Sequence, residues 1–148
     1  MTVIAIFGFT IVTMAQNELS WGTYYTGTGE EWPFGEDVGN SCITDASGNV
    51  YMVGYTSSAA GSNLLATSGA HQSLHAGGPT IFGSGSMDAY LVKFNSSGVR
   101  EWATYYGGSE NDRGLSCATD ASGNVFMIGI TSSTSGIATA GAHLVHLL

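Results

Sequence analysis

The segment Gly29–Asp37 holds the densest group of side chains that could bind a ligand. It contains four carboxylates, those of Glu30, Glu31, Glu36 and Asp37, beside the aromatic rings of Trp32 and Phe34. Carboxylate oxygens are the ligands that Ca²⁺ prefers, and an aromatic ring next to hydrogen-bonding groups can stack on a sugar. The alternative is a solvated acidic insertion whose aromatic residues cover the end of a sheet. We carry Ca²⁺ binding and glycan binding as hypotheses for this loop.

Histidines and cysteines give a weaker indication of a metal site. His71, His75, His143 and His146 have no cysteine or carboxylate at the spacing of a zinc site, so packing or a loop hydrogen bond is the expected role. Cys42 and Cys117 occupy equivalent positions in two copies of a repeat. Equivalent positions of stacked sheets lie ~10 Å apart, whereas a disulfide needs Cα atoms within ~7 Å. We expect two small buried residues and no cofactor other than the possible Ca²⁺.

No pattern of catalytic residues stands out. Gly83-Ser-Gly-Ser86 is not the Gly-x-Ser-x-Gly nucleophile turn. Asp37 recurs as Asp112, and Asp45 recurs as Asp120. An active site is normally unique, so carboxylates that repeat with the chain indicate structural roles. We predict that this chain has no catalytic residues.

Two copies of Asp-Ala-Ser-Gly-Asn predict tight hairpin turns. An aspartate at the first position can accept hydrogen bonds from the turn backbone, and the glycine can take the left-handed conformation. A calcium loop would need further carboxylates that these segments lack. The expected structural turn residues are Asp45, Gly48 and Asn49 in the first copy and Asp120, Gly123 and Asn124 in the second.

The composition is typical of many short strands joined by tight turns. The chain has 148 residues, 22 of them Gly and only two Pro, and 9% are charged, against about a quarter in an average globular protein. Its net charge is −8, with only three basic residues, Lys93, Arg100 and Arg113. Three cations cannot form the positive surface that nucleic acids require, so nucleic-acid binding is excluded.

The N-terminus predicts export. An apolar run spans Val3–Val12, which is too short to cross a bilayer, where about 20 residues are needed. Small residues at Thr13 and Ala15 fit a signal peptide covering residues 1–15, although no Lys or Arg precedes the run. The alternative is a buried N-terminal strand. The predicted location of the protein is therefore extracellular or at the cell surface, without a transmembrane segment.

The chain also matches itself. Residues 41–58 align with 116–133 at an offset of 75, with 14 of 18 positions identical, and shorter matches join Trp21–Tyr25 to Trp102–Tyr106 and Gly69–His71 to Gly141–His143. The expected strands are 20–25, 41–45, 50–56, 88–94, 100–106, 115–120 and 125–131. Residues 50–56 are apolar on both faces, so both faces should be covered, as in a propeller blade between two neighbours. The prediction is an all-β fold, a partial β-propeller of about two four-stranded antiparallel blades.

Three segments then point to a family. Residues 102–109 (WATYYGGS), 44–57 (TDASGNVYMVGYTS) and 88–98 (DAYLVKFNSSG) resemble the bacterial SBBP β-propeller repeat, and the likeness extends from residue 20 to about 143. The resemblance implies an exported protein that is secreted or attached to the cell surface, often through type IX secretion. It implies no catalytic residues.

The expected organisation is a signal peptide (1–15), a first repeat with a long Gly/Ser-rich surface loop (16–100) and a second, incomplete repeat (101–148). Because a closed propeller takes about four to eight blades, we interpret the chain as an N-terminal fragment. Its function would be that of a scaffold or a binding or adhesion module. Its partners would be the remaining blades or further copies of itself, and a glycan or protein ligand. The alternatives are the propeller of an extracellular hydrolase whose catalytic residues lie elsewhere, and a short unit that closes a ring by self-association.

Overall fold

The computed structural model describes residues 5–11, 17–25, 36–57, 65–77 and 86–142, which form eight β-strands and no helix. Accordingly, this part of the chain holds no helix of the length and apolarity that a bilayer requires. All strand pairs are antiparallel, so the predicted all-β class is confirmed. The strands are β1 (Ala5–Ile11), β2 (Asn17–Tyr24), β3 (Asp37–Thr44), β4 (Val50–Thr56), β5 (Asp88–Phe94), β6 (Arg100–Tyr106), β7 (Asp112–Thr119) and β8 (Val125–Thr131).

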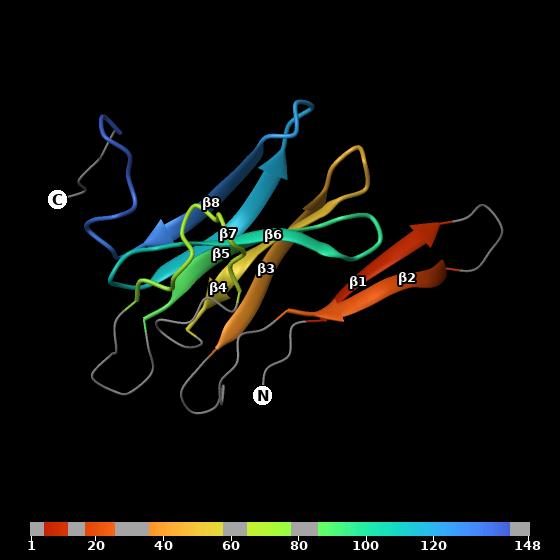
Figure 1. The fold of residues 1–148 in the computed structure, drawn as a ribbon, viewed down its shortest axis with the longest axis horizontal. Coiled ribbons are helices and arrows are strands. Elements are labelled where there is room, and N and C mark those ends of the chain that lie inside the picture. The colour runs from red at the N-terminus through yellow and green to blue at the C-terminus, as the bar shows by residue number, and fades with distance from the viewer. Residues whose placement is uncertain (1–4, 12–16, 26–35, 58–64, 78–85, 143–148) are drawn as a thin grey trace.

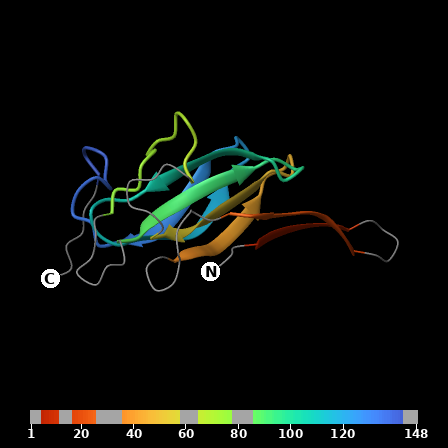
Figure 2. The same ribbon diagram turned by 60° about the horizontal axis from the view of Figure 1, so that its bottom comes forward.

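These strands make three sheets (Figure 1). The largest has four strands in the order β3-β4-β5-β6, and β1-β2 and β7-β8 are two-stranded. All seven predicted strands are present. However, β3 and β7 begin at Asp37 and Asp112, earlier than predicted, because these aspartates pair with Thr56 and Thr131 at the far ends of β4 and β8. The apolar N-terminal segment forms β1, paired with β2 in a hairpin that projects from the body (Figures 1 and 2). Removal of residues 1–15 on export stays a prediction.

The repeat in the sequence is a repeat in the structure. The pair β3-β4 and the pair β7-β8 have the same register 75 residues apart, with Cys42 opposite Met52 and Cys117 opposite Met127. Both pairs carry a bulge at the same place, after Gly39 and after Gly114. We call residues 37–106 the first unit and residues 112–142 the second unit. The predicted repeat boundary after residue 100 falls at the first residue of β6, the last strand of the first unit, because the sequence match also joins β2 to β6.

The central strands of the four-stranded sheet, β4 and β5, are covered on both faces. Because side chains alternate along a strand, even-numbered residues of β4 and β5 form one face, which we call the Tyr90 face. It contains Met52, Tyr90, Val92 and Phe94, and it packs against Tyr25, Leu65 and Ala66. The opposite face, the Val53 face, contains Tyr51, Val53 and Ala89, all buried. Burial on both faces of β4 was predicted from its apolar sequence and is confirmed.

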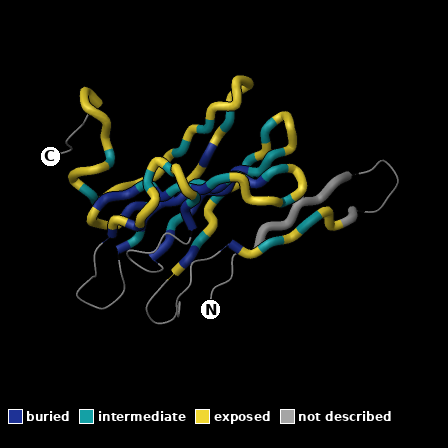
Figure 3. Tube along the Cα trace, in the orientation of Figure 1, coloured by how far each residue is buried: buried dark blue, intermediate teal, exposed yellow. Residues whose placement is uncertain are grey.

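The second unit lies on the Val53 face, where β7 contacts β3, β4 and β5. Gly114 lies so close to Val53 that a Cβ added there would overlap Val53 Cγ2. Asn40 Nδ2 donates to the Gly114 carbonyl at 2.7 Å, and Cys117 Sγ donates to the Tyr51 carbonyl at 3.9 Å. The two units are therefore stacked face to face, and the buried strands lie in the middle of the molecule (Figure 3).

The sequence predicted that the Gly/Ser-rich connection after β4 is a surface loop, but part of this connection is buried. In its described part, residues 65–77, Leu65 and His75 are only 3% and 4% exposed. Backbone amides of Thr67 and Tyr105 donate to the carbonyls of Ala103 and Gln72 across the outer edge of β6. The segment thus satisfies backbone groups that an exposed edge strand would leave unpaired.

The second unit has no such cover. Phe126, Ile128 and Ile130 of β8 are 58%, 67% and 57% exposed. Their equivalents in β4 are Tyr51, Val53 and Tyr55, none of which is exposed. In the described part of the chain β8 also pairs with β7 alone, whereas β4 pairs with both β3 and β5. Strands with nearly the same sequence therefore differ in burial, because only the first unit has neighbours on both faces.

Candidate functional site

The hairpin turns form as predicted. Asp45 Oδ1 accepts hydrogen bonds from the amides of Ser47 and Asn49, both at 2.9 Å, and Asn49 Nδ2 donates to Asp45 Oδ2 at 2.8 Å. Asp120 makes the same three bonds with Ser122 and Asn124. Gly48 and Gly123 have φ of 76° and 83°, the left-handed conformation that the turns require. The carboxylates of Asp45 and Asp120 are thus occupied by their own turns.

The predicted acidic loop is mostly outside the described residues, which include neither Glu30, Glu31, Trp32 nor Phe34. Glu36 is exposed, whereas Asp37 is 1% exposed and its Oδ1 accepts a hydrogen bond from Thr56 Oγ1. The described residues contain no group of three or more His, Cys, Asp or Glu side chains that could hold a metal ion. Ca²⁺ at this loop stays a hypothesis.

The cysteines differ from each other. Both are free thiols. Cys117 is buried, and burial raises the pKa of its thiol. Cys42 is exposed, so the prediction that both would be buried is wrong for Cys42. The reason is position: β7 packs on the first unit, but the corresponding face of β3 has no unit on it in the described chain.

Two of the four histidines lie in the described chain, and both pack against aromatic rings. His71 stacks on Tyr106, with ring centroids 5.8 Å apart. His75 is buried against Tyr105, and its Nε2 lies 3.1 Å from the Thr56 carbonyl. These are the packing and loop hydrogen bond predicted for histidine here.

A buried group of carboxylates lies where strands begin. Asp88 and Asp112, the first residues of β5 and β7, are 0% and 2% exposed. Asp88 Oδ2 accepts from the Ala76 amide at 2.7 Å and from Gln72 Nε2 at 3.0 Å. Asp112 Oδ2 accepts from the Gly108 amide at 2.7 Å and from Ser133 Oγ at 2.8 Å. The second oxygen of each carboxylate, Oδ1, has no hydrogen-bond partner in the described chain.

These carboxylates lie close to each other. A Cβ added to Gly107 would be 2.6 Å from Asp88 Oδ1 and 2.9 Å from Asp112 Oδ2, so only glycine fits between them. Burial raises the pKa of Asp88, and the charge of Asp112 raises it further, against the lowering effect of the Ala76 amide and of His75. His75 Nε2 is 4.0 Å from Asp88 Oδ1, but both side chains are fully buried. The contact of His75 with Asp88 is therefore internal and joins the segment 65–77 to the start of β5.

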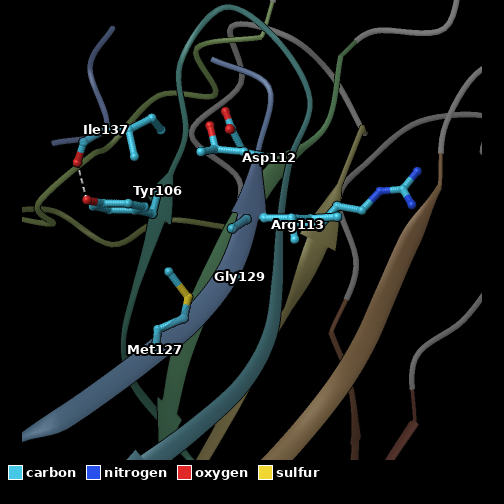
Figure 4. A pocket seen from close by; sticks show the side chains of 9 residues that line it. Tyr106, Asp112, Arg113, Met127, Gly129 and Ile137 are labelled. Atoms are coloured by element: carbon cyan, nitrogen blue, oxygen red, sulfur yellow. Dashed lines mark hydrogen bonds between the residues drawn. The ribbon is translucent and has the colours of Figure 1, made fainter. Parts of the chain in front are cut away.

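A pocket with a volume of about 180 Å³ lies between the two units (Figure 4). We call it the Tyr106 pocket. The Tyr106 hydroxyl donates to the Ile137 carbonyl on one side. Met127 and Gly129 of β8 form the wall below, and Asp112 lies at the upper end. The Arg113 side chain points away from Tyr106, with its guanidinium 4.8 Å from the centroid of the Tyr55 ring.

The Tyr106 pocket is mainly apolar, and its size suits one ring-sized group rather than a drug-sized ligand, for which pockets of about 300–1,000 Å³ are usual. The sequence analysis did not identify it. The signal was present in the repeat, because the pocket's Met127 and Gly129 match Met52 and Gly54 of the first unit. A shallower hollow of about 470 Å³ runs between residues 67–71 and β6, beside Trp102 and His71.

Comparison with protein-family models finds no match to this chain, and comparison with curated proteins likewise finds none.

Proposed function

We propose that the chain is a non-catalytic, exported segment of a β-propeller repeat protein that serves as a scaffold or binding module of a larger surface or secreted protein. The observation that supports it best is the stacking of two like units. A four-stranded antiparallel sheet carries on one face a second unit whose first two strands repeat its register, as adjacent blades of a propeller do.

Binding would use the loops and hollows at the strand ends. Scaffolds of rigid strands commonly carry ligands on their connecting segments. The acidic loop at residues 29–37 is the proposed site for Ca²⁺ or a glycan. Since Asp37 is already held by Thr56, Ca²⁺ there would depend on Glu30, Glu31 and Glu36.

The export part of the proposal is tested in the source cell. An antibody raised against residues 16–148 should detect the protein in the secreted or envelope fraction, and mass spectrometry should find its N-terminus at Gln16. Loss of β1 should be tolerated, because Trp21 of β2 and Tyr25, the residue after β2, pack on Phe94 of the first unit. A cytoplasmic protein that retains residues 1–15 would contradict export.

Self-association is a second candidate, and a specific observation favours it. The contact between the units uses the Val53 face of one unit and Gly114 with Cys117 of the other. Because of the repeat, each side of this contact occurs a second time in the chain, and the second occurrence is exposed. Phe126 and Ile128 of β8 correspond to the Val53 face, and Gly39 and Cys42 of β3 correspond to Gly114 and Cys117. A second copy could therefore place its β3 on β8 as β7 lies on β4. Such a contact is head-to-tail and forms rings or filaments.

A mixing experiment distinguishes this arrangement from others. Ile128→Glu should block one half and Cys42→Glu the other, so each variant alone should sediment as a monomer while an equimolar mixture forms a heterodimer. Val99→Glu, at a residue that is 60% exposed and in neither half, is the control and should associate like the wild type. A wild-type chain that stays monomeric, or a Cys42→Glu variant that associates normally, contradicts head-to-tail association.

A further inference from the structure

The Tyr106 pocket corresponds to a position that is filled in the first unit. There the side chain of Tyr90, from β5, is completely buried. Its hydroxyl donates to the Val38 carbonyl at 3.0 Å, and its ring lies 5.4 Å from that of Tyr25. Gly54 leaves room for it, since a Cβ at Gly54 would be 2.7 Å from the Tyr90 hydroxyl oxygen.

The partners of Tyr90 recur around the Tyr106 pocket. In the first unit they are Tyr25, Val38, Met52, Gly54 and Leu65. Four of them have equivalents at the offsets found in the sequence, and Leu65 corresponds to Ile137 because the carbonyl of each accepts a hydrogen bond from a tyrosine. The five equivalents all line the pocket and are Tyr106, Arg113, Met127, Gly129 and Ile137.

The hydrogen bond that closes one wall is repeated as well. Tyr25 donates from its hydroxyl to the Leu65 carbonyl at 3.0 Å, and Tyr106 donates in the same way to the Ile137 carbonyl. The difference is that no residue equivalent to Tyr90 is present, because the described part of the second unit has no strand beside β8 that is equivalent to β5.

We infer that the edge of β8 and the Tyr106 pocket together form a binding site for an extended segment of a second polypeptide, added as a β-strand with a tyrosine inserted into the pocket. The backbone of β8 supplies hydrogen bonds along the edge, and the pocket supplies side-chain selectivity, as in other cases of β-strand addition. The inference deepens the proposed function, on which it rests for the likeness of the two units, by naming the partner's chemistry.

The register of β5 against β4 defines the preferred sequence. Tyr90 lies opposite Gly54, Asp88 opposite Thr56 and Val92 opposite Met52. In the second unit the corresponding positions of β8 are Gly129, Thr131 and Met127. The partner segment should therefore have the pattern Asp-x-Tyr-x-Val, with the three side chains on the face that β8 turns toward the pocket.

Peptide binding to the purified full chain tests this. A labelled peptide with the sequence of residues 87–94 should bind, as read by fluorescence anisotropy, and should slow amide hydrogen exchange along β8. Replacing the peptide's tyrosine by alanine should weaken binding by about tenfold or more, because a whole aromatic ring leaves the pocket. Replacement by phenylalanine should have a smaller effect, because it removes only the hydroxyl, which would donate to the Arg113 carbonyl as Tyr90 donates to the Val38 carbonyl.

The chain offers matched variants. Ile137→Trp should fill the pocket and abolish the preference for tyrosine. Leu74→Trp, at a residue 54% exposed in the segment 65–77, should bind like the wild type. Equal affinity for the tyrosine and alanine peptides would overturn the pocket's role, and absence of binding by any peptide would overturn strand addition. Neither result bears on export or on the stacking of the units, which the fractionation and unfolding experiments test separately.

Discussion

Asp45 and Asp88 are both held by backbone amides, but solvent reaches only Asp45. The Asn49 side chain and the turn amides hold the pKa of Asp45 below its ordinary value, so its ionised form stabilises the folded chain. Burial does the opposite to Asp88 and raises its pKa. The two residues therefore affect stability with opposite dependence on pH.

Two isosteric variants make this measurable. Asp45→Asn should be less stable than the wild type at neutral pH, and the difference should vanish as pH falls through the lowered pKa, since protonation removes the same interaction from the wild type. For Asp88 the unfolded chain ionises first as pH rises, so the wild type loses stability between the ordinary and the raised pKa. Asp88→Asn should therefore gain stability relative to the wild type over that range.

The measurement is urea unfolding from acid to neutral pH, and the titratable residues that face Asp88, His75 and Asp112, are kept in every protein compared. Differences of the same sign for both variants would contradict these assignments. The turn role of Asp45 could be predicted from sequence because its partners lie within four residues. The role of Asp88 could not be predicted from the sequence, since Gln72, Ala76 and Gly107 reach it from distant parts of the chain.

At the scale of elements, β4 and β8 show how far a strand's sequence determines its surroundings. Strand propensity and the turn motifs predicted both strands with their observed bounds. The apolar pattern also predicted cover on both faces, which β4 has and the exposed β8 lacks. Cover depends on what lies beside a strand, and that information is absent from the strand itself. The same reason explains why Cys42 is exposed although Cys117 is buried.

Sequence patterns likewise could not predict that β6 pairs with the segment 65–77. That segment has no regular alternation, and its backbone hydrogen bonds to β6 are isolated ones, between Thr67 and Ala103 and between Gln72 and Tyr105. Side-chain contacts, such as the stacking of His71 on Tyr106, add to them. Only the folded chain shows that these residues close one edge of the first unit, whereas β8 pairs with β7 alone in the described part of the chain.

At the scale of the whole molecule, the described residues form a stack of two units with one face of contact between them, and Ile128 and Cys42, which repeat the two halves of that contact, are exposed. The proposed self-association and the proposed strand addition both depend on this stack. Its most specific feature is the approach of Gly114 to Val53, because the equivalent glycine of the first unit, Gly39, is exposed.

The most direct measurement is the free energy of unfolding of Gly114→Ala beside Gly39→Ala. In the stacked arrangement a methyl group at position 114 overlaps Val53, so Gly114→Ala should cost about 1–3 kcal/mol, as overpacking usually does. Gly39→Ala should cost much less. In a Val53→Ala background, which makes room, the cost at position 114 should shrink. Equal costs at positions 39 and 114, unchanged by Val53→Ala, would contradict the stacking of the two units.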